Sequence, residues 1–312
     1  MNKASCNNIK IFRSIASLRQ WRRECLLRQE SVGFVPTMGA LHKGHMALVR
    51  RSLEENKHTV LSIFVNPSQF APHEDLDQYP RTFESDLEKL KSLGNGTVDA
   101  VFVPTVGEMY PSGINLEVSK QKGAFVNVLG CSEQLEGSRR PQFFRGVATV
   151  VTKLLHVVTP ERVYFGQKDA QQCVVIKNLV KDLLIDTEVR IVPVIREANG
   201  LALSSRNVYL SDATKDKASI IYKSLKAGEE FYRRKVQDGP VRADDIISTI
   251  KASLQNSSLD YSLQYLAVSD RESLDDLKIV EPSKGALVST ALAVKDDQAK
   301  EPTRLLDCII LE

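Results

Sequence analysis

Two histidines, His42 and His45, stand where a short apolar segment gives way to a helical pattern. Residues 32–35 are β-formers, and apolar side chains after His45 recur at helical spacing. Gly39 and Gly44 allow a ligand to approach the backbone closely. The first turn of a helix offers N–H groups to phosphate, and imidazoles can donate to charge that develops there. The pattern predicts a nucleotide-binding turn, although the pair taken alone also fits two solvated loop histidines.

A second polar segment, residues 64–70, follows the next strand pattern and contains Asn66, a proline and Gln69. Buried amides at such a place can read the hydroxyl and the carboxylate of a substrate, because an amide both donates and accepts. The segment therefore predicts a binding site for a small polar substrate. A plain Asn-Pro turn is the alternative.

A third loop runs from Tyr79 into a helical pattern at Thr82. A threonine in that position commonly accepts a hydrogen bond from the first turn of a helix. We expect Thr82 to cap the helix, which gives the loop a structural role. Asp86 follows within the helical pattern.

Two further segments carry groups suited to phosphate. Residues 166–172 place Lys168 where a strand pattern changes to a helix, and a lysine there can neutralise a transferring phosphoryl group. An ordinary surface lysine is the alternative. Residues 203–207 offer two serine hydroxyls and the guanidinium of Arg206 to phosphate oxygens, or else form a helix cap.

Strand and helix patterns alternate up to residue 194, which predicts an α/β fold. The expected strands are residues 32–37, 60–65, 100–103, 162–165 and 189–194, and the expected helices start at Gly44 or span residues 82–93, 146–158 and 169–183. Such alternation implies right-handed crossovers, a doubly wound Rossmann-like parallel sheet, and a ligand crevice at the carboxyl ends of the strands. The five polar segments lie at those ends or in the loops near them.

The pattern changes after residue 195. Two amphipathic helices, about residues 213–236 and 243–254, precede strands near residues 262–268, 286–294 and 305–311. We therefore expect a Rossmann-like domain over residues 1–194 and a smaller α+β C-terminal domain over residues 195–312. The charged residues 295–302 predict an exposed hairpin loop.

The composition is that of a soluble globular protein, with 42% hydrophobic and 26% charged residues in 312. The net charge is only +3, and basic pairs such as Arg22-Arg23 are scattered among acidic residues, so the sequence does not predict nucleic-acid binding. Most of these pairs are expected on solvated faces.

Five cysteines, at positions 6, 25, 131, 173 and 308, are widely spaced and form no Cys-x-x-Cys pair. This usage favours a reducing compartment, with the cytoplasm as the expected location, and no structural zinc. Membrane helices need about 20 apolar residues, and no run approaches that length, so no membrane partner is expected. The first residues lack the apolar segment of a signal peptide.

In their combination and order, the five polar segments resemble those of the pantoate–β-alanine ligases, or pantothenate synthetases, among the nucleotidylyltransferase-like adenylating enzymes. The resemblance extends from Val35 to Asp307 and is densest from Pro36 to Asn207. It implies that ATP and pantoate form pantoyl adenylate and pyrophosphate, after which the amine of β-alanine gives pantothenate and AMP. It also implies Mg²⁺ with ATP, and a homodimer.

The resemblance implies a role for each matching residue. Catalytic roles fall to His42, His45, Lys168 and Arg206. ATP contacts fall to Thr37, Met38, Gly39, Gly44, His45, Gly166, Gln167, Lys168, Asp169, Ile195, Leu203, Ser204, Ser205 and Arg206. Pantoate contacts fall to Met38, Asn66, Gln69, Tyr79 and Gln172, and Asp86 lies near the magnesium region of the family. Because positioning supplies much of the rate, His45 is expected to act as an electrostatic and acid-type group rather than as a strong base.

Two features depart from the family pattern. Many relatives have Arg-Pro-x-His-Phe where this chain has Phe143 in place of the histidine, which puts the role of a histidine there in doubt. Residues 295–302 form a longer segment than in compact relatives.

Two other functions remain open at this stage. One is a different enzyme of the same superfamily, a nucleotidylyltransferase or a tRNA-synthetase-like protein; the glutamines Gln69 and Gln172, and the lack of a basic module, argue against it. The other is a catalytically silent binding protein. Retention of His42, His45, Lys168 and Arg206 together argues against that alternative.

Overall fold

The computed structural model describes residues 9–72, 74–93, 96–296, 299 and 301–312. The chain forms two compact units. Unit 1 comprises Met1–Ser132, Gly137–Gly166 and Val175–Val192, and unit 2 comprises Glu133–Glu136, Gln167–Val174 and Pro193–Glu312. The domain boundary expected between residues 194 and 195 stays a prediction.

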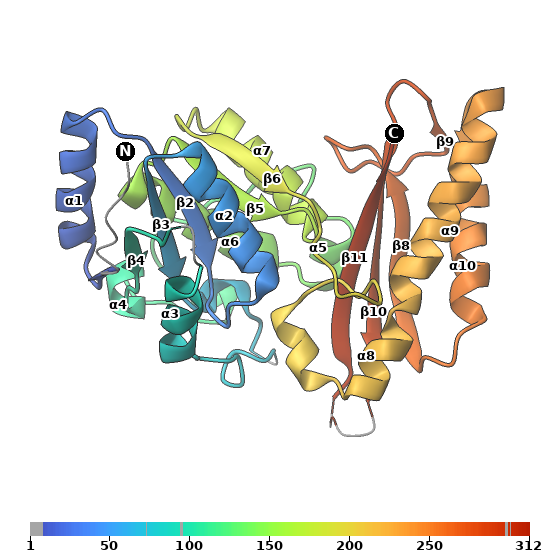
Figure 1. Ribbon diagram of the computed structural model, residues 1–312, viewed down its shortest axis with the longest axis horizontal. Coiled ribbons are helices and arrows are strands. Elements are labelled where there is room, and N and C mark those ends of the chain that lie inside the picture. Colours follow the sequence, from blue (N-terminus) through green and yellow to red (C-terminus); the bar gives the residue numbers. More distant parts are fainter. Residues whose placement is uncertain (1–8, 73, 94–95, 297–298, 300) are drawn as a thin grey trace. The chain divides into compact units, whose positions relative to one another are not determined.

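Unit 1 contains a six-stranded parallel sheet, which confirms the doubly wound fold (Figure 1). In spatial order the strands are β1 (Lys10–Phe12), β4 (Ala100–Phe102), β3 (His58–Ile63), β2 (Val32–Thr37), β5 (Arg162–Gly166) and β6 (Glu188–Val192). The order reverses between β2 and β5, so the topological switch point lies there. The histidine turn follows β2, and the segment with Lys168 follows β5.

Helices cover both faces of this sheet. Alternate strand residues, among them Val35, Leu61 and Val101, form one core cluster with α2 and α3, because successive side chains of a strand point to opposite faces. The helices up to α7 are α1 (Ile15–Leu27), α2 (Lys43–Glu55), α3 (Phe83–Lys91), α4 (Val106–Met109), α5 (Glu136–Arg139), α6 (Phe143–Val158) and α7 (Ala170–Asp182), with 3₁₀ turns η1 (Pro67–Gln69) and η2 (Val118–Lys120). Helices α5 and α7 contain residues of both units.

Arg22 is an exception to the expectation that most of the basic pairs lie on solvated faces. Its side chain is buried, donates to the carbonyl of Thr159 at 2.8 Å, and forms a 2.6 Å ion pair with Glu161. A guanidinium can satisfy the last carbonyls of a helix, here α6.

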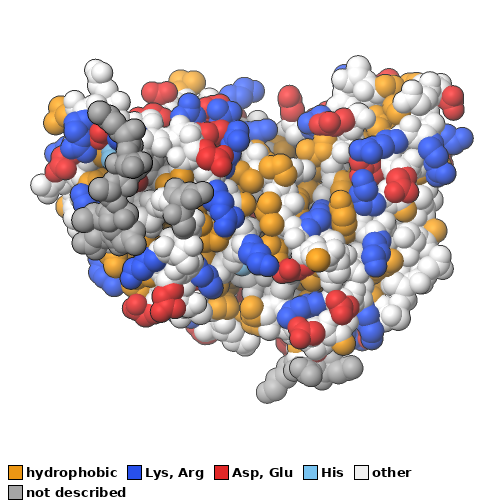
Figure 2. Space-filling view, viewed as in Figure 1, with side chains coloured by type: hydrophobic (Ala, Val, Ile, Leu, Met, Phe, Trp, Pro, Cys, Tyr) orange, Lys and Arg blue, Asp and Glu red, His pale blue; other side chains and the backbone are white. Residues whose placement is uncertain are grey.

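On the face drawn in Figure 2, lysine and arginine side chains are interspersed with aspartate and glutamate.

Unit 2 confirms the α+β expectation. A three-stranded antiparallel sheet pairs β11 (Thr303–Leu311), β10 (Ala286–Val294) and β8 (Tyr261–Ser269), and a two-stranded sheet pairs β7 (Val241–Arg242) with β9 (Ile279–Val280). Its core comes from these strands together with α8 (Asp212–Ala218), α9 (Ile220–Lys235) and α10 (Ala243–Gln255); η3 (Ser205–Tyr209) and η4 (Val236–Asp238) complete the unit.

Three local expectations need correction. The helix expected over residues 213–236 is two helices, because the hydroxyl of Ser219 donates back to the carbonyl of Asp216 at 2.6 Å. The hairpin loop after β10 is not wholly exposed: Asp296 is buried and accepts two hydrogen bonds from Ser211. Residues 297, 298 and 300 lie outside the described part. Thr82 precedes α3 as expected, but its side chain makes no capping hydrogen bond.

Four cysteines, Cys25, Cys131, Cys173 and Cys308, are buried free thiols, and Cys6 lies outside the described residues.

Candidate active site

The turn after β2 has a backbone shape that needs a glycine. Gly39 has φ +87°, and a Cβ there would lie 3.1 Å from Ile63 and 3.3 Å from the carboxylate of Asp86. Thr37 holds the turn, since its hydroxyl donates to the carbonyl of Ser62 at 2.6 Å and accepts the N–H of Gly39 at 3.1 Å. These contacts fix the backbone of the turn that leads into α2.

Asp86 fixes the same turn from α3. Its carboxylate is fully buried and accepts the N–H groups of Ala40 at 2.9 Å and Leu41 at 2.8 Å. Both oxygens are thus bonded to backbone in a place closed to solvent. This arrangement does not fit a direct magnesium ligand, which needs carboxylate oxygens that face the ion and its waters.

His42 and His45 begin α2 as a reciprocal cap. Nδ1 of His42 accepts the N–H of Gly44 at 3.1 Å, and Nδ1 of His45 accepts the N–H of His42 at 3.3 Å. The two ring centroids lie 4.1 Å apart. A nitrogen that accepts a hydrogen bond carries no proton, so a neutral ring in this arrangement has its proton on Nε2. Both rings are half-buried, and each uses Nδ1 in the cap.

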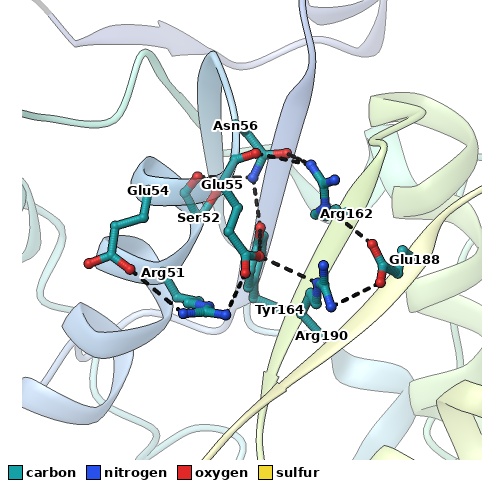
Figure 3. A network of polar contacts seen from close by, with 9 residues as sticks. All are labelled: Arg51, Ser52, Glu54, Glu55, Asn56, Arg162, Tyr164, Glu188 and Arg190. Atoms are coloured by element: carbon teal, nitrogen blue, oxygen red, sulfur yellow. Dashed lines mark hydrogen bonds and ion pairs between the residues drawn. The ribbon is translucent and has the colours of Figure 1, made fainter.

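The carboxyl end of α2 is anchored by the polar network in Figure 3. Tyr164, fully buried on β5, donates to Glu55 at 2.8 Å and accepts from Asn56 at 2.7 Å. Arg162 donates to the Glu55 carbonyl at 3.0 Å, and Arg190 lies 3.4 Å from the Glu55 carboxylate. Burial alone would raise the pKa of Glu55, but the Tyr164 hydroxyl and the arginines lower it. The helix that carries both histidines is therefore tied to β5 and β6.

The predicted amides lie together on the loop after β3. Asn66 and Gln69 are buried, and the Asn66 amide donates to Gln69 Oε1 at 2.9 Å and to the carbonyl of Gly146 at 3.2 Å. Tyr110 donates to Asn66 Oδ1 at 2.6 Å, and burial raises the pKa of this tyrosine to about 12, so the hydroxyl keeps its proton. Tyr110 and Gly146 are residues that sequence reasoning missed.

Gly146 explains how α6 reaches this loop. A Cβ at this position would lie 2.3 Å from the carbonyl oxygen of Ser68 and 2.6 Å from the Cα of Gln69, so only a glycine permits the contact. Glycine in a helix costs up to about 1 kcal/mol relative to alanine. That unfavourable choice was the one signal in the sequence that could have identified Gly146.

Phe143, at the position where the family resemblance implies a histidine, has a structural role. The guanidinium of Arg140 lies 4.0 Å from the centroid of the Phe143 ring, and donates to the carboxylate of Glu74 at 2.8 Å and to the carbonyl of Gln69 at 3.2 Å. A cation over an aromatic face is favourable. Phe143 thus supports the arginine that holds the backbone of Gln69.

Tyr79, another predicted pantoate contact, is buried edge-on against Phe70, with ring centroids 6.0 Å apart.

Unit 1 also contains a cavity of about 510 Å³ at the carboxyl ends of β2, β3 and β4. Met38 and Gly39 of the predicted site line it. The other lining residues are Ile63, Phe64, Val65, Pro67, Leu76, Asp77, Pro80, Arg81, Thr82, Phe83, Val103, Pro104, Thr105 and Val106. The histidine turn therefore borders a hollow at the edge of the sheet where α/β proteins bind ligands.

Unit 2 carries the remaining predicted residues on two segments. After Gly166 at the end of β5, Lys168 forms a 2.8 Å ion pair with Asp169, and Gln172 is half-buried on α7. The neighbouring Gln171 is structural, because it accepts from the N–H of Glu136 at 2.9 Å. A lysine paired with an adjacent exposed carboxylate can exchange that partner for phosphate.

The second segment is a hairpin that leads to η3. The carbonyl of Ile195 accepts the N–H of Leu203 at 3.0 Å, and Ser204 caps η3 by accepting the N–H of Arg206 at 3.3 Å. Ser204, Ser205 and Arg206 are half-buried. The predicted helix-cap arrangement is therefore present, and it holds Ser205 and Arg206 at the start of a helical turn.

A cluster at the amino ends of the strands contains metal-type ligands, Cys25, Glu30 and His58. His58 lies 2.8 Å from Glu30 and 2.8 Å from Asp99, and Arg28 lies 2.8 Å from Glu30. These contacts make the cluster a network of ion pairs and hydrogen bonds.

This network predicts an acid-dependent loss of stability. Hydrogen bonds from His58, and then from Arg28, lower the pKa of Glu30 to about 2 from 4.5. A carboxylate with a lowered pKa stabilises the fold above its unfolded value, and that contribution is lost as the pH falls through about 2. The difference in melting temperature between the wild type and Glu30→Gln should be largest above pH 4.5 and shrink below it. The exposed Glu88→Gln is the control, and a difference that does not change with pH would contradict the assignment.

The fold and the site together define a class of protein. A doubly wound parallel sheet, a reciprocal histidine cap at a glycine turn after β2, and a second polar turn after β5 are the features of a Rossmann-like nucleotide-binding enzyme. Among the residues that the structure describes, no helix combines the length and apolar character needed to cross a membrane.

Comparisons with known proteins identify the family. Residues 10–310 match the family described as Pantoate-beta-alanine ligase. The chain is 45% identical to the pantoate–beta-alanine ligase of Saccharomyces cerevisiae, an alignment that covers 97% of this chain and 100% of that protein. It is 41% identical to the pantothenate synthetase of Thermodesulfovibrio yellowstonii, with the same coverages. The chain belongs to the pantoate–beta-alanine ligase family, a family of enzymes.

Solved structures agree with this assignment. The crystal structure of pantothenate synthetase from Thermus thermophilus is similar with a TM-score of 0.82 and 39% identity, over 96% of this chain and 99% of that chain. The pantoate-beta-alanine ligase from Francisella tularensis, complexed with beta-gamma ATP and beta-alanine, gives a TM-score of 0.72 and 31% identity, over 97% and 98% of the two chains.

Proposed function

We propose that this enzyme condenses pantoate with β-alanine at the expense of ATP, through a pantoyl-adenylate intermediate. The observation that carries the proposal is the reciprocal cap of His42 and His45, which uses Nδ1 of each ring and so assigns the donor role of a neutral ring to Nε2. Membership of the family supports the overall reaction, and the Francisella relative was crystallised with beta-gamma ATP and β-alanine.

In the first step, a carboxylate oxygen of pantoate attacks the α-phosphorus of ATP. The bond from that phosphorus to the bridging oxygen breaks, and pyrophosphate leaves with the electron pair. Charge therefore accumulates on phosphate oxygens, and the step needs donors and cations there more than it needs a base. We assign this role to His42, His45, Lys168 and Arg206, with Ser204 and Ser205 as hydroxyl donors.

In the second step, the amine of β-alanine attacks the carbonyl carbon of the adenylate. The bond to the AMP oxygen breaks, AMP leaves, and the amine loses a proton. Holding both reactants in one geometry can contribute about 7–11 kcal/mol to catalysis, so no covalent intermediate with the enzyme is required.

Pantoate binding is assigned to the amides of Gln69 and Gln172, with Asn66, Tyr79 and Met38 beside them. The Asn66 amide holds Gln69 Oε1, which leaves the Gln69 NH₂ group as the donor for a carboxylate or hydroxyl. Magnesium is proposed to enter bound to the phosphates of ATP, where it offsets their charge, since Asp86 does not fit as its ligand. The homodimer and the cytoplasmic location stay predictions.

Isotope exchange tests the proposed function. Labelled pyrophosphate should exchange into ATP when pantoate and magnesium are present and β-alanine is absent, because the adenylate forms reversibly before the amine is needed. AMP should accumulate with turnover only when both pantoate and β-alanine are supplied. Exchange that required β-alanine would exclude the two-step order, and exchange that depended on another carboxylic acid, such as an amino acid, would favour a different adenylating enzyme.

A further inference from the structure

The hairpin that leads to Ser204 is held by one arginine. Residues 196 and 202 form an antiparallel bridge, and the side chain of Arg196 donates to the carbonyl of Gly200 at 3.1 Å. Its guanidinium lies 3.6 Å from the ring centroid of Tyr222. Gly200 has φ +98°, and a Cβ there would lie 2.8 Å from Tyr222, so the hairpin tip packs directly on α9.

Arg196 is in turn fixed by the last strand of the unit. It makes a bidentate ion pair with Asp307 on β11, with distances of 2.6 and 2.7 Å, and donates to the carbonyl of Cys308 at 3.3 Å. The Asp307 side chain is only 3% exposed. Bidentate pairs fix the orientation of a guanidinium as well as its distance, so the strand sets where the hairpin lies.

The next residue on β11 holds the other polar segment of the unit. The thiol of Cys308 donates to the carbonyl of Gln167 at 3.2 Å, and burial raises the pKa of this thiol to about 12, so it keeps the proton that it donates. Gln167 directly precedes Lys168. Two consecutive residues of one strand therefore hold Arg196 of the hairpin that leads to Arg206, and the residue that precedes Lys168.

We propose that Asp307 and Cys308 are positioning residues that set the spacing of the Lys168 segment and the Ser204–Arg206 segment for the phosphates of ATP. The proposal rests on the proposed function in assigning those two segments to phosphate. Asp307 acts through Arg196, and Cys308 acts through the backbone of Gln167. A misplacement of about 1 Å in a group that binds the transition state can lower a rate about 10²-fold.

The test uses the variants Asp307→Asn, Arg196→Gln, their double variant, and Cys308→Ala. We expect Asp307→Asn to lower the single-turnover rate of pantoyl-adenylate formation about 10²-fold and to weaken ATP binding, with pantoate affinity unchanged. The double variant should be no worse than the more affected single variant, because the two side chains act as one unit. Cys308→Ala leaves the ion pair intact and should weaken ATP binding several-fold.

Glu229→Gln is the matched control. Glu229 is a largely buried carboxylate of unit 2 that pairs with Lys226 at 2.7 Å, on a helix that carries none of the assigned residues. It should lower the melting temperature without changing the adenylation rate of the folded protein. Equal losses of ATP and pantoate affinity in Asp307→Asn, or an unchanged rate in both Asp307→Asn and Cys308→Ala, would overturn the proposal.

The two proposals fail in different ways. If the wild type shows no pantoate-dependent exchange, the proposed function is wrong, and titration with ATP and magnesium still tests whether Asp307 sets nucleotide affinity. If the wild type exchanges pyrophosphate and the variants bind and exchange as well as it does, only the positioning role is wrong.

Discussion

Replacement of His45 by alanine should lower the rate of pantoyl-adenylate formation by about 10²–10³, which corresponds to the loss of one preorganised donor worth roughly 2.7–4 kcal/mol. We expect His45 to contribute through Nε2, because its Nδ1 accepts the N–H of His42. The measurement is single-turnover adenylation with saturating ATP and pantoate. A rate close to that of the wild type would remove His45 from the mechanism.

The alanine variant also loses part of the cap of α2, so stability must be separated from chemistry. Glutamine in the third position of a capping box can accept the same backbone N–H. His45→Gln should therefore keep more of the melting temperature than His45→Ala while losing as much activity. His156→Ala, at an exposed histidine on α6, is the control for removing an imidazole and should leave the rate unchanged.

The histidine turn could be predicted because its signals are local. A strand, two glycines and two histidines follow one another within fourteen residues, from Val32 to His45, and strand β2 and helix α2 fall within one residue of their expected starts. Spacing along the chain is enough to identify such a motif. The same holds for β10, which the structure places at Ala286–Val294 as expected.

The supporting contacts could not be predicted because they join distant parts of the chain. Asp86 was expected near magnesium, but its carboxylate faces a turn about 45 residues earlier, and no local pattern records that contact. Tyr110 meets Asn66 across 44 residues, and Asp307 meets Arg196 across 111. Helix α1 was missed for a related reason: Arg22 interrupts its apolar stripe, yet this arginine is itself buried by a partner far along the chain, Glu161.

Gly146→Ala should lower kcat/KM for pantoate about 10²-fold while ATP affinity stays unchanged. The added Cβ would lie 2.3 Å from the carbonyl of Ser68, so α6 or the loop that carries Gln69 must shift. Overpacking of this kind also costs about 1–3 kcal/mol of stability, more than alanine returns through its helix propensity. Steady-state kinetics with pantoate as the varied substrate, together with thermal unfolding, measures both effects.

Two control glycines distinguish a loss of stability caused by crowding from a displacement of the Asn66 and Gln69 side chains, which are assigned to pantoate. In Gly107→Ala, the nearest heavy atom to the new Cβ, Thr105 Oγ1, lies 4.0 Å away, so neither stability nor kinetics should change much. In Gly228→Ala, the new Cβ would lie 2.5 Å from Ile250 in unit 2, so stability should fall while the KM for pantoate does not. If Gly146→Ala behaves like Gly228→Ala, losing stability but keeping its KM for pantoate, then α6 supports the fold without placing Gln69. A selective rise in the KM for pantoate would instead mean that Gly146 sets the position of Gln69. It would do so through backbone contact alone, because a glycine has no side chain to place in the site.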